Sequence, residues 1–134
     1  MILTLCGSAS FEPYWHEANK QLGLAGHICF SLMTFPSVEG EKAWMSPEQK
    51  QTLDLAHLAK IEESSGVVML NIENYLGESS LRELEWARMR GKTIFWTLKE
   101  SRQRPGEWDA RTLLGFPPRS GHWLELLEAV ERKR

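Results

Sequence analysis

Residues 67–96 read VVMLNIENYLGESSLRELEWARMRGKTIFW, and their pattern changes twice along the segment. The segment VVMLNI at Val67–Ile72 is apolar and rich in β-branched residues, which predicts a central strand. Ser79–Arg90 is expected to form a helix that Gly91 ends. TIFWTL at Thr93–Leu98 predicts the next strand. A strand, a helix and a strand in this order indicate two parallel strands joined by a crossover helix.

The rest of the chain repeats this alternation. Strands are expected at Met1–Cys6 and His27–Met33, and helices at Phe11–Leu24, from a cap at Ser46 to Glu62 or Glu63, and at Gly121–Arg134. The long irregular stretch Thr34–Met45 is a candidate lid. The alternation predicts an α/β fold with a mostly parallel sheet of about four to five strands and helices on both faces. A chain of 134 residues fits one domain, expected to span 1–134.

Composition and charge exclude several kinds of partner. The net charge of −2 gives no general attraction to a nucleic-acid polymer or an anionic membrane. No segment has the roughly 18–20 apolar residues that span a bilayer, and the first residues lack the basic region of a signal peptide. Cys6 and Cys29 lie in strand-like runs without a C-x-x-C motif. This favours a reduced pair in a cytoplasmic protein over a disulfide.

Three turns are expected to meet at one edge of the sheet. Right-handed crossovers place the turns after parallel strands at the carboxyl edge, where α/β proteins bind ligands. These turns are Gly7–Phe11, the loop after Met33, and Asn71–Ser80. The small residues Gly7-Ser8-Ala9-Ser10 suit an anion or a sugar hydroxyl, or form a plain turn with a serine cap. They match neither G-x-G-x-x-G nor a P-loop, so we expect no cofactor.

Glu83 has two interpretations. Ser80-Leu81-Arg82-Glu83 fits the capping box S-x-x-E, and the local pattern favours this structural role. A carboxylate one turn into a helix at the carboxyl edge would instead point near an active cleft, as a nucleophile or general base. Elsewhere, Asp54 and His57 share a helix face, either as an orienting pair or as a surface histidine with an acidic neighbour. No His, Cys and carboxylate set has metal-ligand spacing, so no metal is expected.

The ordered motifs resemble a known family. LCGSASF at 5–11, LDLAHLAKI at 53–61 and the stretch at 67–96 together resemble the nucleoside 2-deoxyribosyltransferase-like superfamily, which includes the 2′-deoxynucleoside 5′-phosphate N-hydrolases. The resemblance covers residues 1–98 and is most specific in the G-x-S-[ST]-x-x-E-x-x-x-A run that starts at Gly77. It implies a flavodoxin-like three-layer sandwich, a small-molecule nucleoside or nucleotide as substrate, and a homodimer or higher homo-oligomer.

The resemblance also implies roles for individual residues. Glu83 falls on the glutamate that attacks the anomeric carbon, giving a glycosyl-enzyme intermediate that water or a second base resolves. Helix N–H groups are expected to keep it ionised. His57 lies nearest the place of an orienting aspartate, with Asp54 one turn earlier. The expected substrate-binding residues are Gly7, Ser8, Phe11, Asn71, Gly77, Ser79 and Ser80, and the other candidates for stacking on the base are Tyr14, Phe35 and Trp44.

Departures from the family pattern leave other functions open. The family usually has an acidic residue just before the third strand, where this chain has Ser64-Ser65-Gly66. This favours a second hypothesis, a non-catalytic nucleotide-binding or sensor module on the same fold. A third is a phosphate-dependent hydrolase of the lysine-decarboxylase-like cytokinin-activating group, whose PGGxGTxxE run is missing here. Hydrolysis and transfer both stay open.

Overall fold

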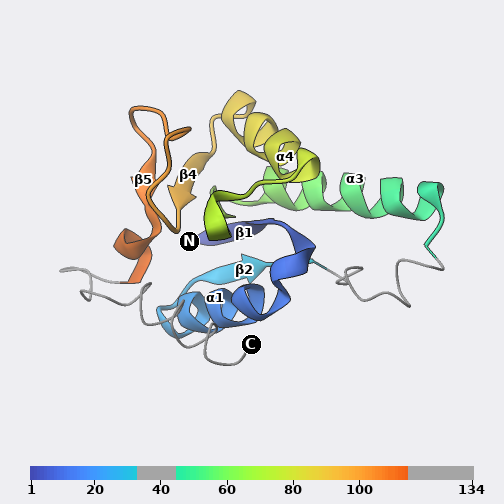
Figure 1. Cartoon of the computed structure of the whole chain (residues 1–134). Coiled ribbons are helices and arrows are strands. Elements are labelled where there is room, and N and C mark those ends of the chain that lie inside the picture. The colour runs from blue at the N-terminus through green and yellow to red at the C-terminus, as the bar shows by residue number, and fades with distance from the viewer. Residues whose placement is uncertain (33–44, 115–134) are drawn as a thin grey trace.

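The computed structural model describes residues 1–32 and 45–114 (Figure 1). Its strands are β1 (Ile2–Gly7), β2 (Ile28–Phe30), β3 (Gly66–Leu70), β4 (Thr93–Trp96) and β5 (Trp108–Asp109). Its helices are α1 (Glu12–Leu24), α3 (Pro47–Glu63) and α4 (Glu78–Met89), with 3₁₀ turns η1 (Ala9–Phe11), η2 (Ile72–Asn74) and η3 (Ala110–Leu114). None of these helices has the length and apolar character to cross a membrane. The expected helix at Gly121–Arg134 and the expected lid, except Met45, lie outside the described residues.

The five strands form one sheet in the order β2-β1-β3-β4-β5, and every neighbouring pair is parallel. This is the flavodoxin-like order, in which ligands bind beside the carboxyl ends of the strands where the order reverses. The reversal lies between β1 and β3, whose register runs from Leu3 opposite Gly66 to Gly7 opposite Leu70. The expected α/β class and parallel sheet are confirmed.

Helices cover both faces of the sheet (Figure 1). On one face, α1 and η3 pack on the sheet through residues such as Leu22, which joins a core with Leu5 of β1. On the other face, Ile61 of α3 and Leu84 of α4 form a second core with Cys6. Successive strand residues point to opposite faces, so the neighbours Leu5 and Cys6 serve different cores. Cys6 therefore faces the layer that contains α3 and α4.

Some element boundaries differ from the expectations. β2 is limited to Ile28–Phe30, and β5 falls at Trp108–Asp109, where the sequence has no apolar run long enough to predict a strand. The start of α3 agrees with the sequence. The Ser46 hydroxyl accepts a hydrogen bond from the Gln49 N–H at 3.1 Å, and Gln49 Oε1 accepts one from the Ser46 N–H at 2.7 Å. This reciprocal pair is a capping box at the predicted cap residue Ser46.

The start of α4 corrects the capping prediction for Glu83. The helix begins at Glu78 after an extended Gly77, and no side chain caps it. The Leu81 N–H donates to the Gly77 carbonyl at 3.0 Å, so the hydrogen-bonded turns start before Ser80. Ser80 therefore lies inside the first turn, and the predicted S-x-x-E box at Ser80 is wrong. Glu83 lies in the second turn, where it has no helix end to cap.

Candidate active site

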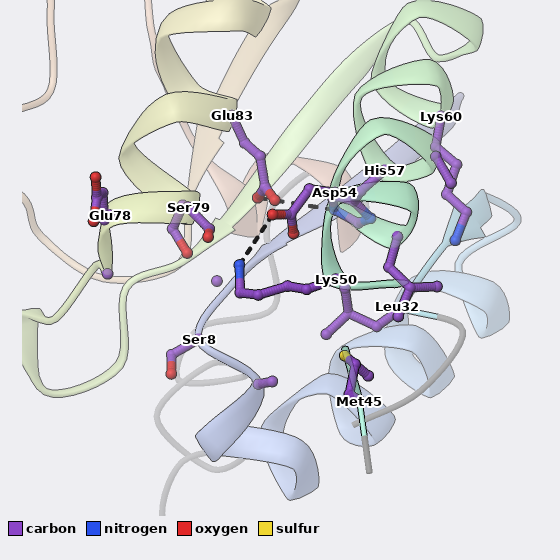
Figure 2. A pocket seen from close by; sticks show the side chains of 16 residues that line it. Ser8, Leu32, Met45, Lys50, Asp54, His57, Lys60, Glu78, Ser79 and Glu83 are labelled. Atoms are coloured by element: carbon purple, nitrogen blue, oxygen red, sulfur yellow. Dashed lines mark hydrogen bonds and ion pairs between the residues drawn. The ribbon is translucent and has the colours of Figure 1, made fainter. Parts of the chain in front are cut away.

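A cavity of about 380 Å³ opens between the turn after β1, α3 and the start of α4 (Figure 2). Its volume is in the range of small-molecule sites. The residues that matter for its chemistry are Gly7 and Ser8 after β1, Lys50, Asp54, His57 and Lys60 on α3, and Gly77, Ser79, Ser80 and Glu83 at the start of α4. The turns after β1 and β3 thus meet at the carboxyl edge, as the topology predicts.

The turn after β1 is held closely against β3. A Cβ at Gly7 would lie 2.9 Å from the Leu70 Cβ and 3.0 Å from the Leu70 carbonyl oxygen, so only glycine fits without a shift. The Ser8 hydroxyl accepts a hydrogen bond from the Ser10 N–H at 3.3 Å. The Ser8 carbonyl accepts one from the Trp15 indole N–H at 2.9 Å. Ser8 thus caps η1 and also lines the cavity.

Glu83 lines the cavity with only 9% of the residue exposed. Burial raises the pKa of its carboxyl from 4.5 to about 8. A hydrogen bond from the Cys6 thiol lowers this pKa, the negative charge of Asp54 raises it, and the positive charges of Arg82 and Lys50 lower it. The expectation that Glu83 stays ionised is therefore wrong near neutral pH, because loss of hydration outweighs the nearby donors and cations.

His57 is buried beside Glu83 and is neutral. Its Nε2 lies 2.8 Å from the Leu5 carbonyl oxygen, which can only accept, so Nε2 carries the hydrogen. Burial lowers the pKa of His57 to about 4, although the Leu5 hydrogen bond opposes this shift. Glu83 Oε2 lies 3.9 Å from Nε2, and since both groups are neutral near pH 7, this contact is not an ion pair. The surface-histidine interpretation is wrong, because the ring packs against β1.

Asp54 lies near Glu83 at the cavity wall (Figure 2). Its carboxylate accepts a hydrogen bond from Lys50 Nζ at 3.0 Å, one helical turn away. No hydrogen bond joins Asp54 to His57 within the described part of the chain, so the two act on each other only through charge. Sequence reasoning missed Lys50 and Lys60 as cavity residues. The i, i+4 spacing of Lys50 and Asp54 is the signal that would have indicated their pairing.

Cys6, His57 and Glu83 bring a sulfur, a nitrogen and an oxygen within 4.8 Å of one another. Sequence spacing does not reveal this cluster, because its members come from three separate elements. The Nε2–H of His57 is directed at Leu5, so this nitrogen has no lone pair to offer a metal. Burial raises the pKa of the Cys6 thiol well above its usual value, which keeps it protonated. A metal here would have to displace both of these protons, and the described geometry assigns none to the cluster.

Phe11 and Asn71 do not line the cavity. Phe11 packs edge-to-face on Tyr14, with ring centroids 6.0 Å apart. The fully buried Asn71 accepts hydrogen bonds from the Thr97 hydroxyl at 2.8 Å and from the Leu98 N–H at 3.1 Å. Asn71 therefore ties the end of β3 to the chain that follows β4. Gly7, Ser8, Gly77, Ser79 and Ser80 are the expected substrate-binding residues that the fold does bring together.

Comparisons with known proteins assign the chain to no family. No family model matches the chain, and no curated protein matches it. A solved structure with some similarity is the CMP N-glycosidase BcmB of Clostridium botulinum. The sequence identity is 17%, the match covers 72% of this chain and 70% of the other, and the TM-score is 0.49.

Proposed function

We propose that the protein is an enzyme that cleaves the N-glycosidic bond of a nucleoside or nucleotide, or transfers its sugar, with Glu83 as nucleophile. The observation that carries this proposal is the position of Glu83. Its carboxyl is nearly buried, lines a small-molecule cavity at the carboxyl edge of the sheet, and is not used to cap α4. The family resemblance of the G-x-S-[ST]-x-x-E run supports the same residue.

The reaction follows from a carboxylate beside an anomeric carbon. Glu83 in its ionised form attacks C1′ as the C1′–N bond breaks, and the bonding electron pair leaves with the base, which takes up a proton. A nearby carboxylate stabilises the positive charge that develops on the sugar. The product is a glycosyl ester of Glu83. Attack on C1′ by water, which loses a proton, releases the free sugar and Glu83, whereas attack by a nitrogen of a second base completes transfer.

The cavity walls suit the two halves of such a substrate. Ser8 and Ser79 present hydroxyl groups on one side (Figure 2), and the start of α4 adds the partial positive charge of a helix N-terminus. This side fits the polar sugar. Leu32 and Met45 form an apolar part of the wall, which fits the flat base. Two of the aromatic residues expected to stack on the base, Phe35 and Trp44, lie outside the described residues.

The pKa of Glu83 sets the pH at which the reaction runs. The nucleophile is the ionised form, and the pKa of about 8 leaves Glu83 mostly protonated at pH 7. Below pH 8, kcat/KM is expected to rise about tenfold per pH unit and then to level off above it. A panel of deoxynucleosides, ribonucleosides and their monophosphates should therefore be assayed at pH 7 and pH 9, with base release followed by chromatography.

Three variants make this assay decisive. Glu83→Gln keeps the shape and removes the nucleophile, and Glu83→Ala removes the side chain. Glu85→Gln is the matched control, since Glu85 lies two residues further along α4 but is exposed and pairs with Arg88. Wild type and Glu85→Gln should release the base at similar rates, while both Glu83 variants lose at least a thousandfold. Base release that survives in Glu83→Gln, or is missing from the wild type with every substrate, contradicts the proposal.

A second candidate is a nucleotide-binding module without catalysis, and the neutral state of Glu83 favours it. A protonated carboxyl binds a hydroxyl group well but is a poor nucleophile. The serine at position 65, where the family usually has an acidic residue, does not support this second candidate. Ser65 precedes β3 at the amino edge, and its hydroxyl donates a hydrogen bond to the Ile2 carbonyl at 3.2 Å, away from the cavity. Saturable nucleotide binding without base release at pH 7 and at pH 9 would select this candidate.

A further inference from the structure

We propose that Arg102 is a positioning residue for the candidate active site, because it fixes the turn between β3 and α4 that leads into the cavity wall. The consequence for catalysis rests on the proposed function, but the effect on the turn does not. No sequence motif marks Arg102, which lies in the polar stretch 99–104 after β4. Its contacts in the fold are what distinguish it.

The turn between β3 and α4 needs support from outside, because its backbone takes an unfavourable conformation. Glu73 and Asn74 have φ angles of 55° and 59°, in the left-handed region that residues with side chains disfavour. Two such residues in succession persist only where the surrounding structure holds them. From there the chain runs through Tyr75 and Leu76 to Gly77, the residue that precedes α4.

Arg102 holds this turn through a network of hydrogen bonds. Its Nη2 donates to the Asn74 carbonyl at 3.2 Å and to Glu100 Oε2 at 2.9 Å. Its Nε and its backbone N–H donate to Glu100 Oε1 at 2.6 Å and 3.0 Å. Asn71 Nδ2, at the end of β3, donates to Glu100 Oε2 at 3.2 Å. The Glu100 carboxylate thus joins Asn71, just before η2, to the guanidinium that binds Asn74 at the end of η2.

The geometry of the ion pair directs the guanidinium at the turn. The Glu100 side chain is fully buried, whereas the Arg102 side chain is 34% exposed. Hydrogen bonding from Arg102 lowers the pKa of the Glu100 carboxyl to about 2, so the carboxylate is ionised at neutral pH. A bidentate arginine–carboxylate pair has a fixed planar geometry. It leaves the second hydrogen of Nη2 for the Asn74 carbonyl.

The turn also contacts both walls of the cavity. Gly77, Ser79 and Ser80, which follow it at the start of α4, line the cavity. On its other side, Tyr75 packs edge-to-face on Phe11, with ring centroids 6.3 Å apart. Phe11 ends η1, whose first residue lies in the opposite cavity wall. A change in the turn should therefore reach the residues proposed to bind the sugar.

Amide hydrogen exchange measures the turn in substrate-free protein. The Asn74 N–H donates to the Asn71 carbonyl at 3.2 Å, and the Tyr75 N–H donates to the Ile72 carbonyl at 3.0 Å. Both amides should exchange about tenfold faster in Arg102→Met than in wild type, because the turn opens locally. Arg102→Lys keeps the positive charge but lacks the planar fork, so its exchange rates should lie between the two.

Arg111→Met is the matched control, because Arg111 pairs with Asp109 in the same acid-x-arginine pattern. Its backbone N–H, Nε and Nη2 donate to the Asp109 carboxylate at 2.8, 3.0 and 2.7 Å. The two side chains are 49% and 43% exposed and belong to η3 and β5 rather than to the turn. Exchange at the two turn amides should therefore match wild type within about twofold. Equal exchange at these amides in wild type, Arg102→Met and Arg102→Lys overturns the proposal.

Kinetics with the substrate that the panel identifies supply the second readout. In Arg102→Met, KM should rise about fivefold, because the start of α4 binds the sugar only while the turn is fixed. The value of kcat should stay within about twofold of wild type. Glu83 keeps its place because the next residue, Leu84, is anchored in the second core.

The two readouts separate the possible outcomes. A residue that only stabilises the fold would lower the unfolding midpoint and leave both KM and the turn amides unchanged. Faster exchange with an unchanged KM would confine Arg102 to the fold and overturn its role in the site. If exchange rises as stated but neither wild type nor any variant releases a base, the hold of Arg102 on the turn stands and the proposed enzymatic function fails.

Discussion

Substitution of Glu83 by glutamine should make the protein more stable, and increasingly so as the pH rises. In the folded state the pKa of this carboxyl is about 8, against an ordinary value of 4.5. Between these two pH values the folded protein holds a proton on Glu83 that the unfolded chain has released. Folding stability therefore falls as the pH rises, since the unfolded state binds fewer protons. The contribution of this bound proton to folding stability is fully present below pH 4.5 and is lost as the pH passes 8.

The size of the effect follows from the same two values. Each pKa unit corresponds to 1.36 kcal/mol, so the full loss between pH 4.5 and pH 9 is roughly 5 kcal/mol, with roughly 3 kcal/mol already lost at pH 7. Glutamine keeps the shape of the side chain and carries no charge at any of these pH values. The stability difference between Glu83→Gln and wild type should therefore be smallest at pH 4.5 and grow steadily up to pH 8.

Urea unfolding of both proteins at pH 4.5, 6, 7, 8 and 9 measures this difference, because groups other than Glu83 titrate alike in the two chains and cancel. Glu85→Gln serves again as the exposed control and should differ from wild type by less than about 1 kcal/mol throughout. Stability curves of wild type and Glu83→Gln that run parallel from pH 4.5 to pH 9 would contradict this prediction. Parallel curves would mean that burial does not perturb the carboxyl.

Three further changes test how the site is supported. Gly7→Ala should lower the free energy of unfolding by about 1–3 kcal/mol in urea titrations, because the alanine Cβ collides with Leu70. An unchanged unfolding midpoint would show that β1 and β3 are not so closely packed. Asn71→Leu should cost about 2–4 kcal/mol by the same assay, since buried partners of its amide lose their hydrogen bonds; a loss below 1 kcal/mol would contradict this. Arg88→Met should cost about 3–5 kcal/mol, because it leaves the mostly buried Glu107 carboxylate without its 2.7 Å partner. Equal stability of Arg88→Met and wild type would show that this ion pair does not stabilise the fold.

The architecture could be predicted from the sequence because its signals are local and repeat. Apolar runs such as Val67–Ile72 gave the strands, and the Ser46 capping box gave the start of α3. The order of strands and helices then required a parallel sheet with its turns at one edge. The short β5 could not be predicted in this way, because two residues carry no periodic signal and are held as a strand by pairing with β4.

The site could be predicted only in part. Strand-end turns and the resemblance located Gly7, Ser8 and Glu83 correctly in the cavity wall. The sequence did not predict the burial of His57 or the protonation state of Glu83, because both depend on how the helix and sheet layers pack. His57 looks like a surface residue in an amphipathic helix. In the fold its ring packs edge-to-face on Trp15 and hydrogen-bonds the Leu5 carbonyl of β1. Glu83 is expected from the sequence to stay ionised beside the helix N–H groups, yet burial raises its pKa to about 8.

The proposed reaction requires that Glu83 forms a covalent bond to the sugar of a substrate. Mass spectrometry of protein quenched in acid during turnover at pH 9 and then digested with a protease detects this bond. The peptide containing Glu83 should gain the mass of the bound glycosyl group in wild type and Glu85→Gln, and not in Glu83→Gln. Base release without this added mass on Glu83, or with the added mass on Asp54, would contradict it.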